Sequence, residues 1–133
     1  MLRVFVFLFA AIFVTPVLAD EVWNTEWGQV VYEEEIGDVA IWSYPTDKGR
    51  RGWVYFPGLA GNYDHRSVHA GYWIEDGAGS CMVELIGVDG RRSNNWGRVI
   101  LVFDGPAFPT SWTALGGDCF DEPDASLRGE VPN

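Results

Sequence analysis

The feature that most restricts the fold of this chain is the regular interruption of short apolar runs by turn-forming residues. Runs rich in Val, Ile, Trp, Tyr and Phe alternate with clusters of Gly, Asp, Asn or Pro, where glycine adopts backbone angles that other residues resist. This pattern predicts an all-β fold, a single antiparallel β-barrel or β-sandwich of about seven to eight strands. We expect strands at residues 29–35, 38–44, 52–56, 69–75, 80–88, 96–104 and 110–115.

The clearest hairpin is predicted for residues 80–104, around the Asp-Gly turn at 89–90. One face of its second strand is formed by Val99, Leu101 and Phe103, and the other face is largely apolar as well. We therefore expect this strand in the middle of the sheet. Apolar residues at helical spacing are not found after the leader, so almost no helix is expected beyond a turn.

The first 19 residues have the layout of a secretory signal peptide. Arg3 precedes an apolar run at residues 4–14, and the leader ends with the small-residue segment Val17-Leu18-Ala19, after which cleavage is expected. The run is shorter than the roughly 20 residues that span a bilayer, and cleavage would leave Asp20, not a lipid-carrying Cys, as the first residue. We expect an exported product, periplasmic or extracellular, with no membrane insertion after signal cleavage.

Three segments follow from this interpretation: a signal peptide at 1–19, a β-rich domain at 20–120 and a loose C-terminal tail at 121–133. The remaining chain of about 114 residues suffices for one domain with its own core. Its two cysteines, Cys81 and Cys119, most simply form a disulfide in an exported protein. On the chain-entropy model, closing that loop stabilises the fold by about 4 kcal/mol.

The formal net charge of the full chain is −10. Such a charge repels nucleic-acid phosphates and anionic lipid headgroups, so we expect no nucleic-acid partner. The basic residues after the leader are all Arg except Lys48. Their planar guanidinium groups suit carboxylate pairing or aromatic stacking, although solvated surface salt bridges are the simpler role.

Seven tryptophans are the compositional anomaly. Such rings either pack a core or form a platform on which a sugar ring or another apolar face stacks. The platform interpretation is best for Trp23 and Trp27, ahead of the first expected strand, and for Trp53 and Tyr55, which alternate on one face. The candidate ligand-binding residues are Trp27, Trp53, Tyr55 and Glu84.

Glu84 is included because it lies between Met82 and Ile86 in an expected strand. If that face points inward, burial would raise its pKa and make it an acid or a ligand contact; an outward, solvated side chain is the simpler alternative. A carboxylate pair such as Glu84 and Asp104 would also suit a small hydrolase acting on cell-envelope polymers. No serine lies in a nucleophile elbow.

Two groups of residues have metal-ligand chemistry without the pattern that makes it specific. His65 and His69 are four apart after Asp64, but the spacing identifies a zinc site only on a helix, which is not expected there. The acidic cluster Asp118, Asp121, Glu122 and Asp124 lacks the calcium-loop pattern with its central Gly. We predict neither a bound metal nor a cofactor.

The stretch from Gly71 to Gly77 contains Gly71-Tyr72-Trp73, and residues 80–88 and the 89–90 turn follow it. It resembles the Gly-x-Trp strand opening of lipocalin-like and avidin-like barrels. This resemblance implies an antiparallel barrel with one end closed by Trp and an open end shaped by loops, which holds a small ligand or grips another protein.

The main functional hypothesis is a non-enzymatic exported binding or interaction module. Its partner would be a glycan, a small apolar ligand or a protein surface. The alternative is the carboxylate-dependent hydrolase described above, which requires two carboxylates about 5 to 10 Å apart in one cleft.

Overall fold

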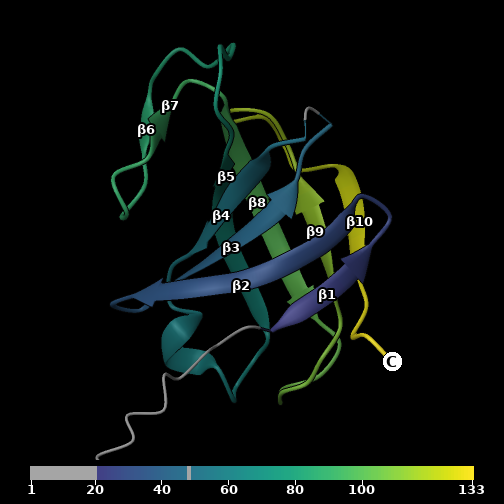
Figure 1. Ribbon diagram of the computed structural model, residues 1–133. Helices are drawn as coiled ribbons and strands as arrows, with labels where there is room; N and C mark the ends of the chain where they lie inside the picture. The colour runs from purple at the N-terminus through teal and green to yellow at the C-terminus, as the bar shows by residue number, and fades with distance from the viewer. Residues whose placement is uncertain (1–20, 48) are drawn as a thin grey trace, which may run out of the picture.

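The computed structural model describes residues 21–47 and 49–133, so the predicted signal peptide lies outside the described residues. Eight strands form one antiparallel sheet in the order β1-β2-β3-β4-β5-β8-β9-β10 (Figure 1). Their bounds are β1 Val22–Thr25, β2 Gly28–Ile36, β3 Val39–Pro45, β4 Arg51–Phe56, β5 Val68–Ile74, β8 Trp96–Phe103, β9 Trp112–Gly116 and β10 Ala125–Gly129. The described chain contains one short 3₁₀ helix, η1, at Ala60–Asn62.

The sheet curls until its two outer strands meet. The amide nitrogen of Asn24 in β1 donates to the carbonyl of Glu130 just after β10, and Glu130 N donates back to Asn24 O, both at 2.9 Å. This single antiparallel bridge makes the sheet a nearly closed barrel and covers both sheet edges at that point. The predicted all-β fold of about seven to eight antiparallel strands is confirmed, and of the two predicted architectures, barrel and sandwich, the structure is the barrel.

Alternation along the strands separates a barrel interior from an outer wall. In β8, Val99, Leu101 and Phe103 are buried, whereas Ile100 and Val102 are exposed. This strand lies between β5 and β9 near the middle of the sheet, as its two apolar faces predicted. The main core lies inside the barrel and consists of inward residues from β1, β2, β3, β4, β8 and β9.

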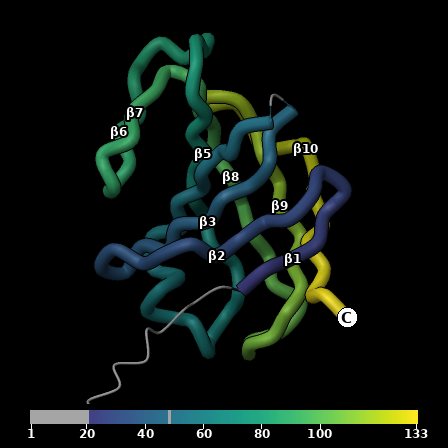
Figure 2. The backbone as a smooth tube through the Cα atoms, viewed as in Figure 1, coloured from purple at the N-terminus to yellow at the C-terminus, as the bar shows by residue number. Residues whose placement is uncertain are grey.

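The chain between β5 and β8 leaves the barrel and returns, and we call residues 75–95 the excursion (Figure 2). It carries a small hairpin, β6 (Leu85–Ile86) with β7 (Arg92–Ser93), around the expected turn, where Gly90 has a φ of 89°. The prediction of a long strand over residues 80–88 is wrong. Only Leu85 and Ile86 of this segment are in a strand, and they pair with β7 and not with the barrel sheet.

A second hydrophobic core lies between the excursion and the outer wall of the barrel. Ile41, Tyr55 and Ile74 contribute the outward side of β3, β4 and β5, and Cys81 and Trp96 pack against them. Both faces of these strands are apolar in the sequence because one face packs inside the barrel and the other packs in this second core.

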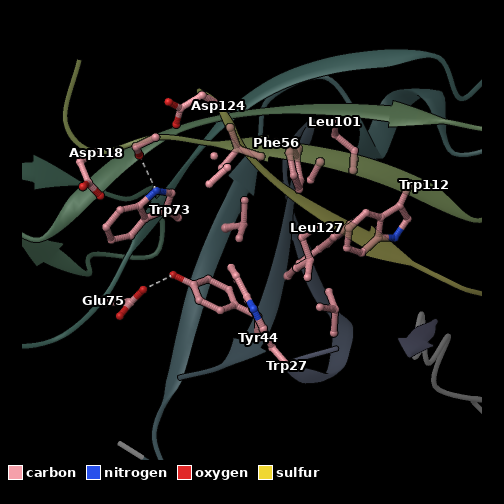
Figure 3. A pocket seen from close by; sticks show the side chains of 18 of the residues that line it. Trp27, Tyr44, Phe56, Trp73, Glu75, Leu101, Trp112, Asp118, Asp124 and Leu127 are labelled. Carbon is pink, nitrogen blue, oxygen red and sulfur yellow. Dashed lines mark hydrogen bonds between the residues drawn. The ribbon is translucent and has the colours of Figure 1, made fainter. Parts of the chain in front are cut away.

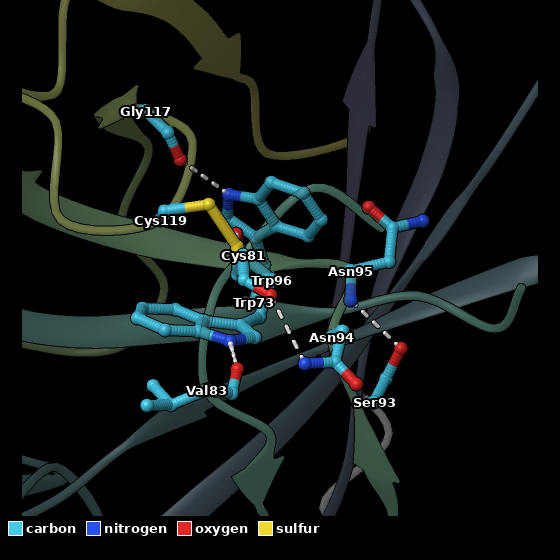
Figure 4. The surroundings of a disulfide bond; sticks show 9 residues. All are labelled: Trp73, Cys81, Val83, Ser93, Asn94, Asn95, Trp96, Gly117 and Cys119. Carbon is cyan, nitrogen blue, oxygen red and sulfur yellow. Dashed lines mark hydrogen bonds between the residues drawn. A yellow bond between two sulfur atoms is a disulfide. The ribbon is translucent and has the colours of Figure 1, made fainter. Parts of the chain in front are cut away.

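The predicted disulfide between Cys81 and Cys119 is present, with a Cα–Cα distance of 5.4 Å (Figure 4). It joins the excursion to the loop between β9 and β10. Around it, Asn94 Nδ2 donates to Cys81 O at 3.0 Å and Trp96 Nε1 donates to Val83 O at 2.8 Å (Figure 4). The excursion is therefore held to the barrel by a covalent bond and by a small apolar core.

Two strands of the barrel sheet were not predicted from the sequence. The short β1 lies ahead of the first expected strand, and β10 lies in the tail expected to be loose from residue 121 onward. In β10 only Leu127 and Gly129 are not exposed, so the segment lacks an apolar signal of its own. It is a strand because all five of its residues pair with β9 and because its end meets β1.

The end of the barrel near η1 is closed by packed aromatic rings. Trp23 lies 4.4 Å from Trp42 and 5.9 Å from Trp112 between ring centroids, and Trp23 Nε1 donates to Thr110 O at 2.8 Å. Leu59, in the loop that carries η1, is fully buried against the same core. We call this region the closed end.

A buried ion pair reinforces the closed end. Arg66 donates to the carboxylate of Glu21 at 2.8 and 2.5 Å, and its guanidinium carbon lies 4.5 Å from the ring centroid of Tyr63 and 5.0 Å from that of Phe103. Burial is the largest single influence and disfavours the charge, but the hydrogen bonds and the negative charge of Glu21, together with Tyr63, outweigh it and raise the pKa of Arg66. This arginine both pairs with a carboxylate and stacks on aromatic rings.

Candidate functional site

A cavity of about 430 Å³ occupies the other half of the barrel (Figure 3). This volume falls within the range of roughly 300 to 1,000 Å³ that is typical of small-molecule sites. Its walls come from almost every strand of the barrel, so residues distant in sequence meet there. The apolar wall residues are Val30, Trp42, Val54, Phe56, Val99, Leu101, Trp112, Ala114 and Leu127.

The floor of the cavity is the aromatic cluster of the closed end. Trp42 and Trp112 line the cavity and pack on Trp23 behind them, with 5.6 Å between their own ring centroids. The indole Nε1 atoms of both residues are buried without a hydrogen-bond acceptor in the described part of the chain. The floor is therefore aromatic, with two indole N–H groups that form no hydrogen bond within the described part of the chain.

The mouth of the cavity is lined by Trp27, Tyr44, Trp73 and Glu75 (Figure 3). Tyr44 Oη donates to a carboxylate oxygen of Glu75 at 2.7 Å, and Trp73 Nε1 donates to Gly117 O at 2.9 Å. Burial and the hydrogen bond to Glu75 raise the pKa of Tyr44, so its hydroxyl stays protonated and remains a donor.

Two strand glycines create the space for these rings. Gly52 of β4 pairs with Tyr44, and a Cβ atom at this position would lie 2.2 Å from the Tyr44 ring. Gly97 of β8 pairs with Trp73, and its Cβ would lie 2.4 Å from the indole nitrogen. Neither glycine marks a turn; each lets an aromatic ring from the next strand lie across the barrel wall.

Acidic residues from two segments line the apolar cavity. Glu75 follows β5, and the loop between β9 and β10 contributes the other four lining carboxylates, Asp118, Asp121, Glu122 and Asp124. We call these five residues the acidic rim. Among residues 21–47 and 49–133, no three or more His, Cys, Asp or Glu side chains are grouped so as to hold a metal ion.

A second hollow of about 340 Å³ adjoins the mouth. It shares Trp27, Tyr44 and Glu75 with the cavity and extends past Pro45 to Asp47. The exposed Trp27 ring thus borders both hollows, with its centroid 6.4 Å from that of Tyr44.

The structure separates the four residues predicted to bind a ligand. Trp27 lies at the mouth of the cavity. Trp53 and Tyr55 lie on the outer wall within the second core, where Arg91 stacks 3.6 Å above the Trp53 ring and Tyr55 Oη donates to Asp89 at 2.7 Å.

Glu84 lies in the excursion and outside any strand, so its predicted place inside a strand is wrong. Arg92 Nε donates to its carboxylate at 2.6 Å. Asp104, its suggested partner in a hydrolase, instead accepts a hydrogen bond from Arg128 of β10 at 2.7 Å. Neither carboxylate lines the cavity.

Of the residues considered as metal ligands, the acidic cluster lines the cavity and the two histidines do not. His65 is exposed in the loop after η1, and His69 is in β5 with its ring 6.0 Å from Phe103. The acidic cluster of residues 118–124, considered above for calcium, lies entirely at the cavity mouth. The sequence thus shows these carboxylates as a cluster but does not show that they lie at the cavity mouth.

Tyr44, Trp73 and Glu75 were missed as site residues. The Gly-x-Trp resemblance singled out Trp73, and the alternation of Trp42 and Tyr44 in β3 was a usable sign that both rings share one face. Nothing in the sequence pairs Tyr44 with Glu75, 31 positions away.

Among the described residues, no helix has the length and apolar character needed to cross a membrane. Comparisons with protein-family models, curated proteins and solved structures found no match to this chain. The cavity itself therefore carries the evidence on function.

Proposed function

We propose that this protein is an exported, non-enzymatic binding protein that holds a small, largely apolar ligand inside its barrel. The observation that carries the proposal is the cavity of about 430 Å³, whose floor and walls are aromatic and aliphatic. A space of this size and lining, open at one end, is the usual form of a small-molecule site in an eight-stranded barrel.

The positions of the aromatic rings favour a small apolar ligand over a glycan, and the disulfide and the leader pattern support export. The aromatic rings that face the cavity come from several strands, as a concave pocket needs, whereas Trp53 and Tyr55 are covered on the outer wall and offer no flat platform for a glycan. The disulfide suits an oxidising compartment, and the leader pattern of residues 1–19 indicates export.

The experiment is a titration with N-phenyl-1-naphthylamine, a neutral apolar dye that becomes fluorescent in an apolar site. Saturable binding by the wild-type protein is expected. In the variant Ala114→Phe, a larger side chain enters the cavity from β9, and we expect the dye to bind at least about ten-fold more weakly.

The matched control is Leu115→Phe, the next residue of β9, which faces away from the interior and does not line the cavity. It should bind the dye as the wild type does. Circular dichroism would establish that both variants are folded. Absence of saturable binding by the wild type, or equal loss in both variants, would contradict the proposal.

A further inference from the structure

The acidic rim has no positively charged partner among the described residues. None of its five carboxylates forms an ion pair within the described residues, and no described Arg or Lys lines the cavity. Arg98 precedes the lining residue Val99 in β8. Its guanidinium donates to the carbonyl oxygens of Phe120 and Asp121 at 2.8 and 2.9 Å and forms no ion pair with the rim. The opening of an apolar cavity is thus negatively charged.

Aromatic rings lie beside these carboxylates. Trp73 Nε1 donates to the carbonyl of Gly117, the residue before Asp118, and Tyr44 Oη donates to Glu75, so both rings contact the segments that carry the rim (Figure 3). The polar hydrogens of Tyr44 and Trp73 are already used in hydrogen bonds to Glu75 and Gly117. What these residues can offer a ligand is the face or edge of a ring, next to a negative charge.

Ring faces and carboxylates together determine which charge on a ligand is favoured at the mouth. An anionic group would be repelled by the rim, and a neutral group would gain nothing from its charge. A cationic group would be attracted both by the carboxylates and by the electron-rich faces of Trp and Tyr, as in the sites that bind quaternary ammonium groups. A bare metal ion would not need the apolar cavity, and no described cluster is arranged to hold one.

We propose that the ligand is an organic ammonium compound, whose apolar body lies in the cavity and whose cationic group lies at the acidic rim beside Trp73. This inference rests on the proposed function and specifies its ligand class. Since only one end of the cavity carries carboxylates, it also fixes the orientation of the ligand: apolar end toward Trp42 and Trp112, charged end outward.

The test uses three probes with the same alkyl chain: decyltrimethylammonium, decanol and decanoate, each below its micelle-forming concentration. Binding to the wild-type protein is measured by isothermal titration calorimetry or tryptophan fluorescence. We expect the ammonium to bind at least about ten-fold more tightly than decanol, and decanoate to bind most weakly. The preference for the ammonium should decrease as the salt concentration increases, because salt screens the partly exposed rim.

A pair of charge-matched variants localises the effect. In the variant Glu75→Gln with Asp118→Asn, the ratio of ammonium to decanol affinity should fall to within about three-fold of unity. The control, Asp38→Asn with Asp64→Asn, makes the same change in net charge at exposed positions that do not line the cavity, and it should keep the wild-type ratio.

The outcomes separate this inference from the proposed function. If all three probes bind equally, or if decanoate binds best, the inference is wrong while the cavity remains a ligand site. If the control lowers the ratio as much as the rim variant does, the preference arises from overall charge and the assignment to the rim is wrong. If no probe binds, both the inference and the proposed function are overturned.

Discussion

The two ends of the barrel use the same kinds of residue in opposite ways. At the closed end Trp23 is 0% exposed and its indole N–H is bonded to a carbonyl; at the mouth, four positions later, Trp27 is 55% exposed. At the closed end the carboxylate of Glu21 is buried against Arg66, whereas no carboxylate of the acidic rim has an ion-pair partner in the described chain.

This difference distinguishes residues that stabilise the fold from residues free to act on something else. Trp23 and the Glu21–Arg66 pair have their polar interactions satisfied within the protein. Exposed rings, and carboxylates without an ion-pair partner, do not. A ligand can therefore pack against the rings and supply a positive charge to the carboxylates. Tryptophan content alone therefore did not locate a site; the position of each ring relative to the two ends did.

The largest expected effect is the contrast between Trp23→Ala and Trp27→Ala. Loss of the fully buried Trp23 ring should lower the free energy of unfolding by about 3 to 5 kcal/mol, because it leaves a cavity in the closed end. Loss of Trp27 should change it by less than about 0.5 kcal/mol. Urea denaturation of both variants measures the difference.

The binding measurements should show the reverse order. Trp27→Ala should weaken decyltrimethylammonium binding, since its ring borders the mouth. Trp23→Phe, a milder change that keeps a ring behind the cavity floor, should leave binding unchanged. Equal losses of stability in Trp23→Ala and Trp27→Ala would refute the distinction between the two ends.

The second contrast compares the charges. Arg66→Met leaves the Glu21 carboxylate buried without its partner and should cost about 3 to 5 kcal/mol of unfolding free energy. Asp118→Asn at the mouth removes one exposed carboxylate from a group of like charges, so the free energy of unfolding should stay within about 0.5 kcal/mol of the wild type. Thermal denaturation of the two variants at low and high salt measures both changes. A large loss in Asp118→Asn would mean that the rim stabilises the fold.

The smallest effect concerns His69 at the closed end. Burial, together with the positive charge of Arg66, lowers its pKa below the ordinary value of 6.5. As the pH falls below about 6.5, the unfolded chain takes up a proton that the folded protein does not, and stability is lost. The free energy of unfolding should therefore decrease more between about pH 7.5 and pH 5.5 in the wild type than in His69→Gln.

His65→Gln is the matched control, because His65 is exposed in a loop. It should keep the wild-type dependence on pH. If His69→Gln shows the same dependence as well, proton uptake at His69 does not contribute.

Much of the barrel could be predicted because its longer strands carry strong local signals. β3 and β8 combine β-branched and aromatic residues with turns on both sides, and alternation in β8 predicted its central place. β10 could not be predicted, since its residues Ala-Ser-Leu-Arg-Gly have no apolar pattern and become a strand only by pairing with β9.

The candidate site was predicted less well, for a related reason. Trp27 and the carboxylates at 118–124 were noticed as single features, but their common place at one opening depends on how the sheet closes. Trp53 and Tyr55 have the same alternation as a ligand platform would; the excursion covers them, and no property of β4 alone reveals that cover.

By itself, the sequence determined the fold class, the turn at residues 89–90, the disulfide partners and the overall negative charge, because each depends on local pattern or on composition. The tertiary structure decided which face of each strand became interior, which tryptophans were packed and which carboxylates met at the mouth. Such choices depend on contacts between residues far apart in the chain, and only the closed sheet and the excursion create those contacts.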